Sequence, residues 1–378
     1  MNFDFSPEQK SLQAHARRFL ADRCSTAAMR NGISAPTKFV NQIWSEMNEL
    51  GWPAISVPES LGGVGLGTLE VCVLMEEMGR ALMPAPFFST VCLGVELLKS
   101  IASAEANAVL AMIAAGKTLC VSGVGIAQAN SSGISLLVKK DRVSGNIKNV
   151  RDLHIADMVI CPGLSESNEL LLLKIALNED GIACRSETSL DSFIQFGSAD
   201  FNETPVTILA RGQKVQALLD KVSYLGATYL AFEQIGGADA ALELTKDYAL
   251  TRHAFARPIG ANQAVKHKLA EMAVRIELAR SNAYYAAWAA EQASPEIRIA
   301  AATARISACE AYDFTAKECL HLHGGIGYTW EADCHFHYKR ARLLSVYFGG
   351  VIPWSTQLMT ALERGCDNNL HLKVENGF

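Results

Sequence analysis

One long helical pattern restricts the fold of this chain more than any other feature of its sequence. It covers residues 213–252, QKVQALLDKVSYLGATYLAFEQIGGADAALELTKDYALTR. At Gly236-Gly237 we expect a neighbouring backbone to pack closely, because glycine has no side chain to prevent it. Three further helical segments follow, at 260–292, 295–323 and 331–364. A long helix with three helical partners is typical of a four-helix bundle, which we predict for residues 210–378.

The N-terminal part of the chain has a helical pattern as well. Ser6-Pro7-Glu8 is a favourable helix start, because serine caps the first turn and proline is tolerated at its first position. Further along, apolar residues recur at intervals of three and four and so share one helix face: Phe39, Ile43, Trp44, Met47 and Leu50. Gly51 then ends that helix. We therefore predict an all-α domain over residues 1–115.

Between residues 116 and 209 the pattern changes to short β-type runs. TLCVSGVG, GISLLVKKDRVSG, ADMVICPG, ELLLLKIAL, GIACRSE and TPVTILA are separated by Gly, Asn, Asp and Ser. This pattern predicts a small antiparallel β domain in the middle of the chain. The fold class is therefore α+β with three domains, in keeping with 378 residues, which are too many for one simple core.

The composition excludes several classes of function. A net charge of −5 gives no electrostatic basis for binding nucleic acid or an anionic membrane. No apolar run reaches the roughly 20 residues that span a bilayer. The first 20 residues are amphipathic and lack the apolar core of a signal peptide, so we expect a cytoplasmic protein. Its ten cysteines contain no C-x-x-C pair and are interpreted as reduced core residues.

A glycine-rich loop, GGVGLG at 62–67, is similar to a phosphate-binding glycine motif. That fingerprint follows a strand within a βαβ unit, whereas here a helix and a Pro-Glu-Ser turn come first. We therefore interpret this segment as an ordinary connection.

Two other stretches carry more specific signals. In TRHAFARPIGANQAVKHKLAEM, at 251–272, Arg252 offers a fork of donors suited to phosphate, Phe255 a flat ring, and Gln263 an amide that donates and accepts. A charged helix end followed by a proline turn is the alternative interpretation. In HLHGGIGYTWE, at 321–331, Gly324 and Gly325 allow a main chain to approach a ligand, with N–H groups free to meet an anion.

Together with the α-β-α order, these two stretches resemble the acyl-CoA dehydrogenase family over essentially the whole chain. RHAFARPIGANQAVKHKLAEM is similar to the family element R-x-x-F-G-x-P-I-x-x-F-Q-x-x-x-H-x-L-A-D-M, and HGGIGYTWE to its second signature. PESLGGVGLG is similar to its P-E-x-x-G-G-x-G opening.

The resemblance implies a flavoprotein oxidoreductase of lipid metabolism that uses FAD to remove α and β hydrogens from an acyl-CoA thioester. A carboxylate base takes the α proton, and electron-transfer flavoprotein accepts the electrons. Arg252, Phe255 and Gln263 are implied to contact the pyrophosphate and adenosine half of FAD. The 321–325 segment, with His321, Gly324 and Gly325, is implied to do likewise. Such contacts usually reach the cofactor of a neighbouring subunit, so we expect an oligomer.

The sequence departs from the family where the base is expected. The usual Y-E-G-T segment aligns with residues 347–350, which puts Phe348 at the glutamate position. A minority of the family carries the base on the long helix, 26 residues before the arginine; that residue is Gly226, and Ala227 replaces the substrate-binding arginine that follows. Both positions therefore lack a proton acceptor.

The β domain departs as well. The segment at 121–133, VSGVGIAQANSSG, lacks the acidic T-E-x-x-x-G-S-D pattern, and Asn149-Val150-Arg151 stands in place of the Trp-Ile-Thr that holds the flavin ring and thioester. The motifs that would hold the chain's own flavin have lost their usual residues, whereas the motifs that would contact the FAD of a partner subunit are retained. We therefore expect the degenerate subunit of a heteromer, such as those in steroid side-chain and dicarboxylate catabolism, with a related subunit supplying the base.

Three alternatives stay open. A self-sufficient homo-oligomeric dehydrogenase could use a displaced base, either Glu233 or Glu331, although pairing in the bundle and capping of the next helix are the simpler roles for these two. A metal-binding helical protein is suggested by HLH at 321–323 and CHFH at 334–337, but the two histidines of H-x-H point about 200° apart on a helix. A flavin-free structural subunit is the third, and the retained Arg252, Phe255 and Gln263 argue against it.

Overall fold

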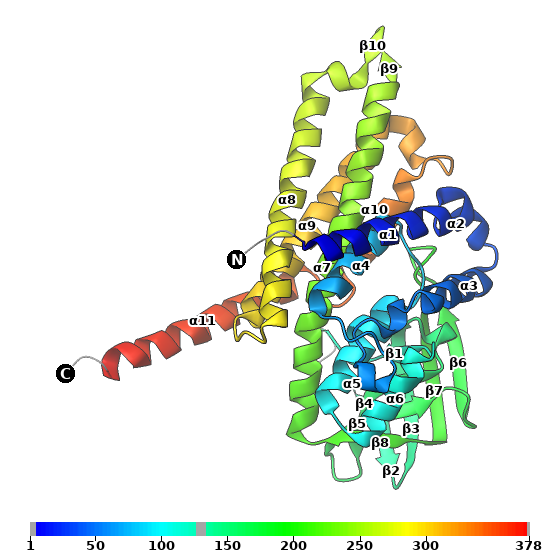
Figure 1. Ribbon diagram of the computed structural model, residues 1–378, viewed down its shortest axis with the longest axis vertical. Helices are drawn as coiled ribbons and strands as arrows, with labels where there is room; N and C mark the ends of the chain where they lie inside the picture. Colours follow the sequence, from blue (N-terminus) through cyan, green and yellow to red (C-terminus); the bar gives the residue numbers. More distant parts are fainter. Residues whose placement is uncertain (1–4, 126–133, 376–378) are drawn as a thin grey trace.

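A computed structural model describes residues 5–125 and 134–375 of the chain, with side chains through residue 363. The segment predicted to lack the acidic flavin pattern lies partly outside these residues, at 126–133. In the described part, helices come first, a β-sheet follows, and helices close the chain, which confirms the predicted order (Figure 1). The sheet lies at one end of the long axis and the β9–β10 hairpin at the other.

The N-terminal part is helical. Its α-helices and the π-helical segment η3 have these bounds: α1 Pro7–Arg23, α2 Thr26–Gly32, α3 Pro36–Glu49, α4 Thr68–Arg80, η3 Phe88–Val95, α5 Glu96–Ile101 and α6 Ala104–Ala114. Ser6 caps α1 in a capping box with Gln9, which confirms the predicted helix start. Gly51 ends α3 with a φ of 73°, as expected. Leu50, which was expected to share the apolar face of this helix, is 52% exposed, because α3 has already ended at Glu49.

The middle of the chain forms one mixed sheet. Its strands are β1 Leu119–Val121, β2 Leu136–Lys139, β3 Arg142–Arg151, β4 Met158–Ser165, β5 Leu170–Ala176, β6 Ile182–Glu187, β7 Phe196–Pro205 and β8 Thr207–Arg211. The order is β6-β7-β3-β2-β4-β5-β8, with β1 beside β4. Pairing is antiparallel except that β4 runs parallel to β1 and β2. The predicted runs missed most of β7, since FGSADFNETP is polar and lacks an alternating pattern.

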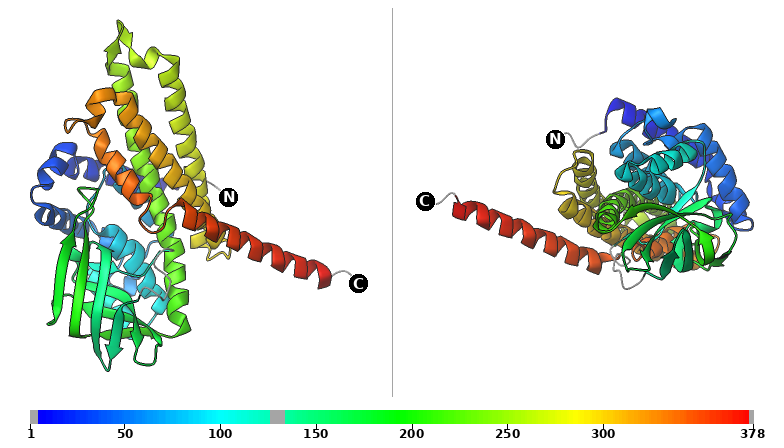
Figure 2. Two further views of the ribbon diagram at one scale, coloured as in Figure 1. Left: turned by 180° about the vertical axis from the view of Figure 1, so that it is seen from behind. Right: turned by 90° about the horizontal axis from the view of Figure 1, so that it is seen from below.

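The C-terminal helices are built around α7, Gln213–Thr251. The others are α8 Gln263–Glu291, α9 Ile297–His323, α10 Cys334–Leu344 and α11 Val351–Glu375. The hairpin of β9 His253–Ala254 and β10 Arg257–Pro258 joins α7 to α8. The single helix expected at 331–364 is two helices, because the loop between Leu344 and Val351 contains Phe348 and Gly349 with φ values of 67° and 92°. Figure 2 shows α11 extending away from the body of the molecule.

The glycine pair on α7 allows two helices to touch, as expected from the sequence. A Cβ atom built on Gly236 would lie 1.8 Å from the carbonyl oxygen of Glu76 on α4. In return, a Cβ on Gly79 of α4 would lie 1.9 Å from the carbonyl oxygen of Glu233 on α7. The backbones of the N-terminal and C-terminal helices are therefore in direct contact. One apolar core continues across this junction, and a second lies within the sheet.

Candidate functional site

The segment after α7 forms an exposed hairpin. Arg252 follows the last residue of α7 and is exposed, with its N–H donating to the carbonyl oxygen of Tyr248 at 2.8 Å. Phe255 and Ala256 form the turn between β9 and β10 with φ values of 53° and 61°. The Phe255 ring is fully exposed, and Gln263, also exposed, begins α8. All three predicted side chains thus face solvent around one turn.

The glycine-rich loop is the second exposed segment. His321 lies in the last turn of α9 with its imidazole exposed, 3.5 Å from the carboxylate of Glu318. Gly324 has a φ of 63°, and neither Gly324 nor Gly325 has an atom within 4 Å of a Cβ built on it. The N–H of Gly324 donates to the carbonyl oxygen of His321, so the expected free N–H at this glycine is wrong. The loop is nevertheless open to a ligand from outside.

A stacked pair joins the two segments. The ring of Tyr248, one turn before Arg252, stacks on His323 with centroids 4.2 Å apart, and its hydroxyl donates to the His323 carbonyl oxygen at 3.3 Å. Because His323 directly precedes Gly324, this stacking places the start of the glycine-rich loop beside the end of α7, where the hairpin begins. Within the described residues, no carboxylate pairs with Arg252. An unpaired guanidinium, an exposed amide and an open glycine backbone fit an anionic dinucleotide.

Apolar side chains surround these polar groups. Leu250, Ile326, Tyr328 and Trp330 are all exposed beside the hairpin and the loop. Exposed apolar side chains gathered near polar anchors are typical of a surface that another protein covers.

The two expected positions of the catalytic base meet in space. Phe348, between α10 and α11, is 6% exposed, and its ring packs edge-on against Phe88 with centroids 5.8 Å apart. A Cβ built on Gly226 would lie 2.7 Å from Cζ of Phe348 and 2.7 Å from Cδ2 of Leu93. The aromatic ring therefore fills the space beside Gly226, and neither residue offers a proton acceptor.

A buried arginine holds the Phe348 loop in this position. The guanidinium of Arg305, on α9, donates to the carbonyl oxygens of Leu344, of Tyr347 at 2.6 Å and of Gly349 at 3.5 Å. The left-handed backbone of Phe348 costs about 1–2 kcal/mol for a residue with a side chain. Three carbonyl contacts to one charged group offset such strain.

Arg151, where relatives have threonine, is buried and bridges the sheet to the helices. Its guanidinium lies 5.1 Å from the ring centroid of Phe88 and 5.8 Å from that of Tyr347. It pairs with Glu233 on α7 and with Asp152, both at 3.6 Å. Burial alone would lower the Arg151 pKa, but the two carboxylates raise it above its usual range. This position does not fit a flavin ring, because the arginine already spans from β3 to the Phe348 loop.

The charged network continues to α10. Arg340 donates to Glu233 at 3.1 Å, to Asp191, and to the carbonyl oxygen of Leu82 at 3.1 Å; Arg340, Asp191 and Glu233 are all buried. Glu233 thus faces two guanidiniums, those of Arg340 and Arg151. This arrangement confirms the ion-pairing role expected for Glu233 as the simpler alternative.

Glu331, the other carboxylate considered as a displaced base, is exposed and lies before α10, whereas Phe348 lies after it. Glu331 was expected to cap or pair at the start of α10; the residue before this helix is Asp333, so Glu331 does not cap it, but its carboxylate interacts electrostatically with Arg30. A hydrogen bond with Thr329 lowers the pKa of the Glu331 carboxyl. The neighbouring Arg30 donates to the Glu331 carbonyl oxygen at 3.3 Å.

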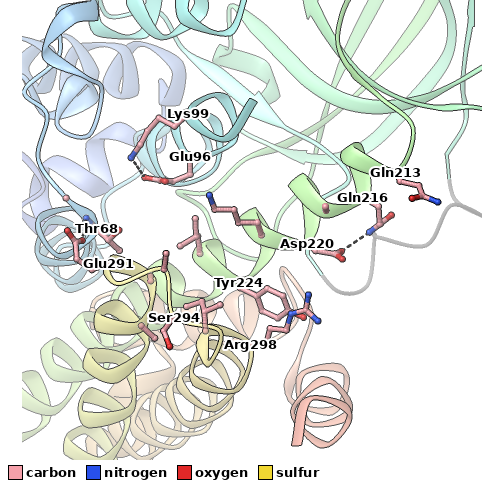
Figure 3. Close-up of a pocket in the computed structure, with 18 residues that line it drawn as sticks. Thr68, Glu96, Lys99, Gln213, Gln216, Asp220, Tyr224, Glu291, Ser294 and Arg298 are labelled. Atoms are coloured by element: carbon pink, nitrogen blue, oxygen red, sulfur yellow. Dashed lines mark hydrogen bonds and ion pairs between the residues drawn. The ribbon is translucent and has the colours of Figure 1, made fainter. Parts of the chain in front are cut away.

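A cavity of about 850 Å³ lies beside the start of α7, against α5 and the α8–α9 turn (Figure 3). Tyr224 and Leu225, directly before Gly226, form part of its wall. Three cations and three carboxylates line it: Lys99, Lys221, Arg298, Glu96, Asp220 and Glu291. No ion pair forms at Lys221 among the residues that the structure describes. Sequence reasoning missed this site because its walls come from four separate segments, with no local motif.

The histidines considered as metal ligands are not gathered together. His321 is exposed whereas His323 is buried, which agrees with the opposite directions expected for H-x-H. His337 is buried beside Tyr312, with its Nδ1 3.2 Å from the tyrosine hydroxyl, and burial lowers its pKa to about 4.

Comparison with known proteins gives matches over most of the chain. A profile of the acyl-CoA dehydrogenase N-terminal domain matches residues 6–117, and a profile of the acyl-CoA dehydrogenase C-terminal domain matches residues 224–351. Acyl-CoA dehydrogenase IpdE2 from Mycobacterium tuberculosis is 30% identical over 335 residues, which are 88% of this chain and 91% of that protein.

Solved structures share the fold. A variant of the Tcur3481-Tcur3483 steroid ACAD is 25% identical with a TM-score of 0.85, covering 95% of this chain and 99% of its own. The ChsE4-ChsE5 complex from Mycobacterium tuberculosis is 23% identical with a TM-score of 0.85, covering 96% and 99%. Within the described residues, no helix combines the length and apolar character needed to cross a membrane.

Proposed function

Since this chain belongs to the acyl-CoA dehydrogenase family, we propose that it is the subunit without a catalytic base in a dehydrogenase made of two related chains. FAD is the cofactor of this family and, when bound, accepts the β hydrogen of the acyl group as a hydride. The proposal rests on the contact between Phe348 and Gly226, the two residues at the expected positions of the catalytic base.

Proton abstraction from the α carbon needs a basic side chain within hydrogen-bond reach. Phe348 fills the place where the family has glutamate, and Gly226 has no side chain. Glu233, the alternative base considered on α7, faces Arg340 at 3.1 Å and Arg151 at 3.6 Å. Each contact ties the carboxylate to a structural ion pair, so the base has to come from another chain.

The exposed hairpin and loop supply what this chain contributes. Arg252 would meet the pyrophosphate of FAD, because its guanidinium is exposed and has no carboxylate partner within the described residues. Phe255, Gln263 and His321 would contact the adenosine half. The open backbone at Gly324 and Gly325 would let the dinucleotide lie close to the loop. These groups point outward, as contacts to a cofactor held by a neighbouring subunit require.

The nature of the partner follows from the same surface. The exposed Leu250, Ile326, Tyr328 and Trp330 provide apolar area for a protein to cover. The relative described as Tcur3481-Tcur3483 steroid ACAD is named for two components, which supports a related acyl-CoA dehydrogenase subunit as the partner. By the same analogy the substrate would be a bulky, ring-bearing acyl-CoA. Electron-transfer flavoprotein would be the electron acceptor, and the cytoplasm the compartment.

Co-expression with the neighbouring acyl-CoA dehydrogenase-like gene product tests the proposal. We expect a heteromer with one FAD per pair of chains and turnover that the lone chain lacks. Arg252→Ala should weaken FAD retention by roughly 10- to 100-fold, as loss of a charged hydrogen bond does. Arg211→Ala, at an exposed site on β8, is the matched control and should retain FAD. Unchanged retention in Arg252→Ala, or rapid turnover by the lone chain, would contradict the proposal.

The cavity beside Gly226 favours a second candidate, a self-sufficient homo-oligomer with a displaced base. Its volume of about 850 Å³ and the amine of Lys221, unpaired within the described residues, would suit the phosphate-bearing part of an acyl-CoA. Under this alternative, the chain purified alone carries flavin absorbance that an acyl-CoA bleaches. Absence of bound flavin in the lone chain rejects it.

A further inference from the structure

Two cysteines and a histidine meet behind the glycine-rich loop. Cys319 and His323 are one turn apart on α9 and so share a face, while Cys334 is the first residue of α10. One ligand atom from each of the three residues lies within 4.8 Å of the other two, and all three residues are buried. The sequence pattern HLH and CHFH already drew attention to His323 and Cys334, and the fold adds Cys319 to these two.

The spacing is close to that of a tetrahedral thiolate-imidazole site. Zinc bonds of about 2.3 Å to sulfur and 2.0 Å to nitrogen place ligand atoms about 3.5–3.8 Å apart. Sγ of Cys319 lies 3.9 Å from Nδ1 of His323. All three ligand atoms lie within 4.8 Å of one another, so the side chains would have to approach by up to about 1 Å to hold such an ion.

The imidazole is already fixed in place. Its Nδ1 lies 2.7 Å from the carbonyl oxygen of Cys319, and its ring stacks on Tyr248. A hydrogen bond from one ring nitrogen to a backbone carbonyl leaves the lone pair on the other, which is the usual support of metal-bound histidine. Binding at Nε2 would keep this bond, and binding at Nδ1 would replace it with the metal.

The charge balance also suits the surroundings. The cysteines pack with Ala241 and Leu320 in a small apolar cluster, where an isolated charge would be costly. Two thiolates and one divalent cation carry no net charge.

We propose that Cys319, His323 and Cys334 form a binding site for a divalent cation that prefers sulfur and nitrogen ligands, with Zn²⁺ as the best match. The ion would join the end of α9 to the start of α10. The intervening residues, 324–333, include the open glycines and the exposed Trp330, so the ion would brace that loop from behind. Its fourth coordination position would take a water molecule or another small donor.

The test uses the full chain, reduced and freed of metal by chelation. Added Co²⁺ should give thiolate-to-cobalt charge-transfer absorption at one ion per chain, and Zn²⁺ should abolish it by displacement. Cys319→Ser and Cys334→Ser should each lose the signal. Cys184→Ser, which removes an exposed cysteine on β6, should keep it. Absence of the signal in the wild-type chain, or its persistence in both Cys319→Ser and Cys334→Ser, would overturn the proposal.

A second measurement needs no substitution at the site. In the wild-type chain, saturating Zn²⁺ should slow alkylation of Cys319 and Cys334 at least tenfold, as followed by mass spectrometry of the peptides. Alkylation of Cys184 should keep its rate. Equal rates with and without Zn²⁺ at Cys319 and Cys334 would overturn the proposal even if the serine variants fail to fold.

Discussion

Replacement of Arg340 by methionine should destabilise the chain strongly. The side chain keeps most of its length, but the guanidinium that pairs with the buried Asp191 and Glu233 is lost. Removing one partner from a buried ion pair leaves an uncompensated charge and costs about 3–5 kcal/mol. Because Glu233 keeps Arg151 nearby, we expect Asp191 to account for most of the loss. Urea unfolding of the lone chain should show a lower midpoint at an unchanged slope.

Arg342→Met is the matched control on the same helix. Arg342 pairs with Asp313 at 2.6 Å, but these side chains are 46% and 37% exposed, so its loss should cost at most about 1 kcal/mol. Adding Asp191→Asn to Arg340→Met should recover part of the loss by removing the stranded charge. If Arg340→Met and Arg342→Met lower the free energy of unfolding equally, burial is not what makes the first pair important.

Three further perturbations probe other parts of the molecule. The pKa of His337 is about 4 in the folded chain and about 6.5 in the unfolded chain, so the free energy of unfolding should fall by about 3 kcal/mol as the pH is lowered from 6.5 to 4. The variant His337→Asn should show a weaker pH dependence than the control His15→Asn, which changes an exposed histidine. Gly236→Ala should cost at least about 1–3 kcal/mol in thermal or urea unfolding, because its Cβ would lie 1.8 Å from a carbonyl oxygen of α4; wild-type stability would contradict the helix contact. Ala256→Gly should stabilise the chain by about 1 kcal/mol, because Ala256 has a φ of 61°, whereas Ala254→Gly in the adjoining strand should not.

Local chemistry made much of the fold predictable. Ser6 and Pro7 mark a helix start through capping, and Gly51 marks a helix end through its positive φ. The Gly236-Gly237 pair predicted close backbone packing because nothing else fits at such a contact. The candidate cofactor residues were found through a motif, and the structure places them on exposed, neighbouring segments.

The features that could not be predicted from the sequence depend on contacts between residues that are far apart along the chain. Arg151, Asp191, Glu233 and Arg340 come from four separate elements, and no spacing along the chain relates them. The helix break at Phe348 was missed because the apolar pattern continues through it, while the backbone turns. Cys319 was overlooked for a similar reason, since its partner Cys334 lies across a loop.

The joint between α4 and α7 and the joint between the sheet and the helices should fail under different conditions. The α4–α7 joint combines a direct backbone contact with ion pairs from Arg80 to Asp239 and Glu243, so salt or acid can weaken only the ion pairs, whereas an added atom at Gly236 would disrupt the backbone contact. The sheet is joined to the helices by apolar contacts and by buried charges that reach α7 and α10, and a neutral substitution can remove the charges. Their loss should therefore loosen the junction between sheet and helices more than the α4–α7 contact, a difference that hydrogen exchange on Arg340→Met would make visible.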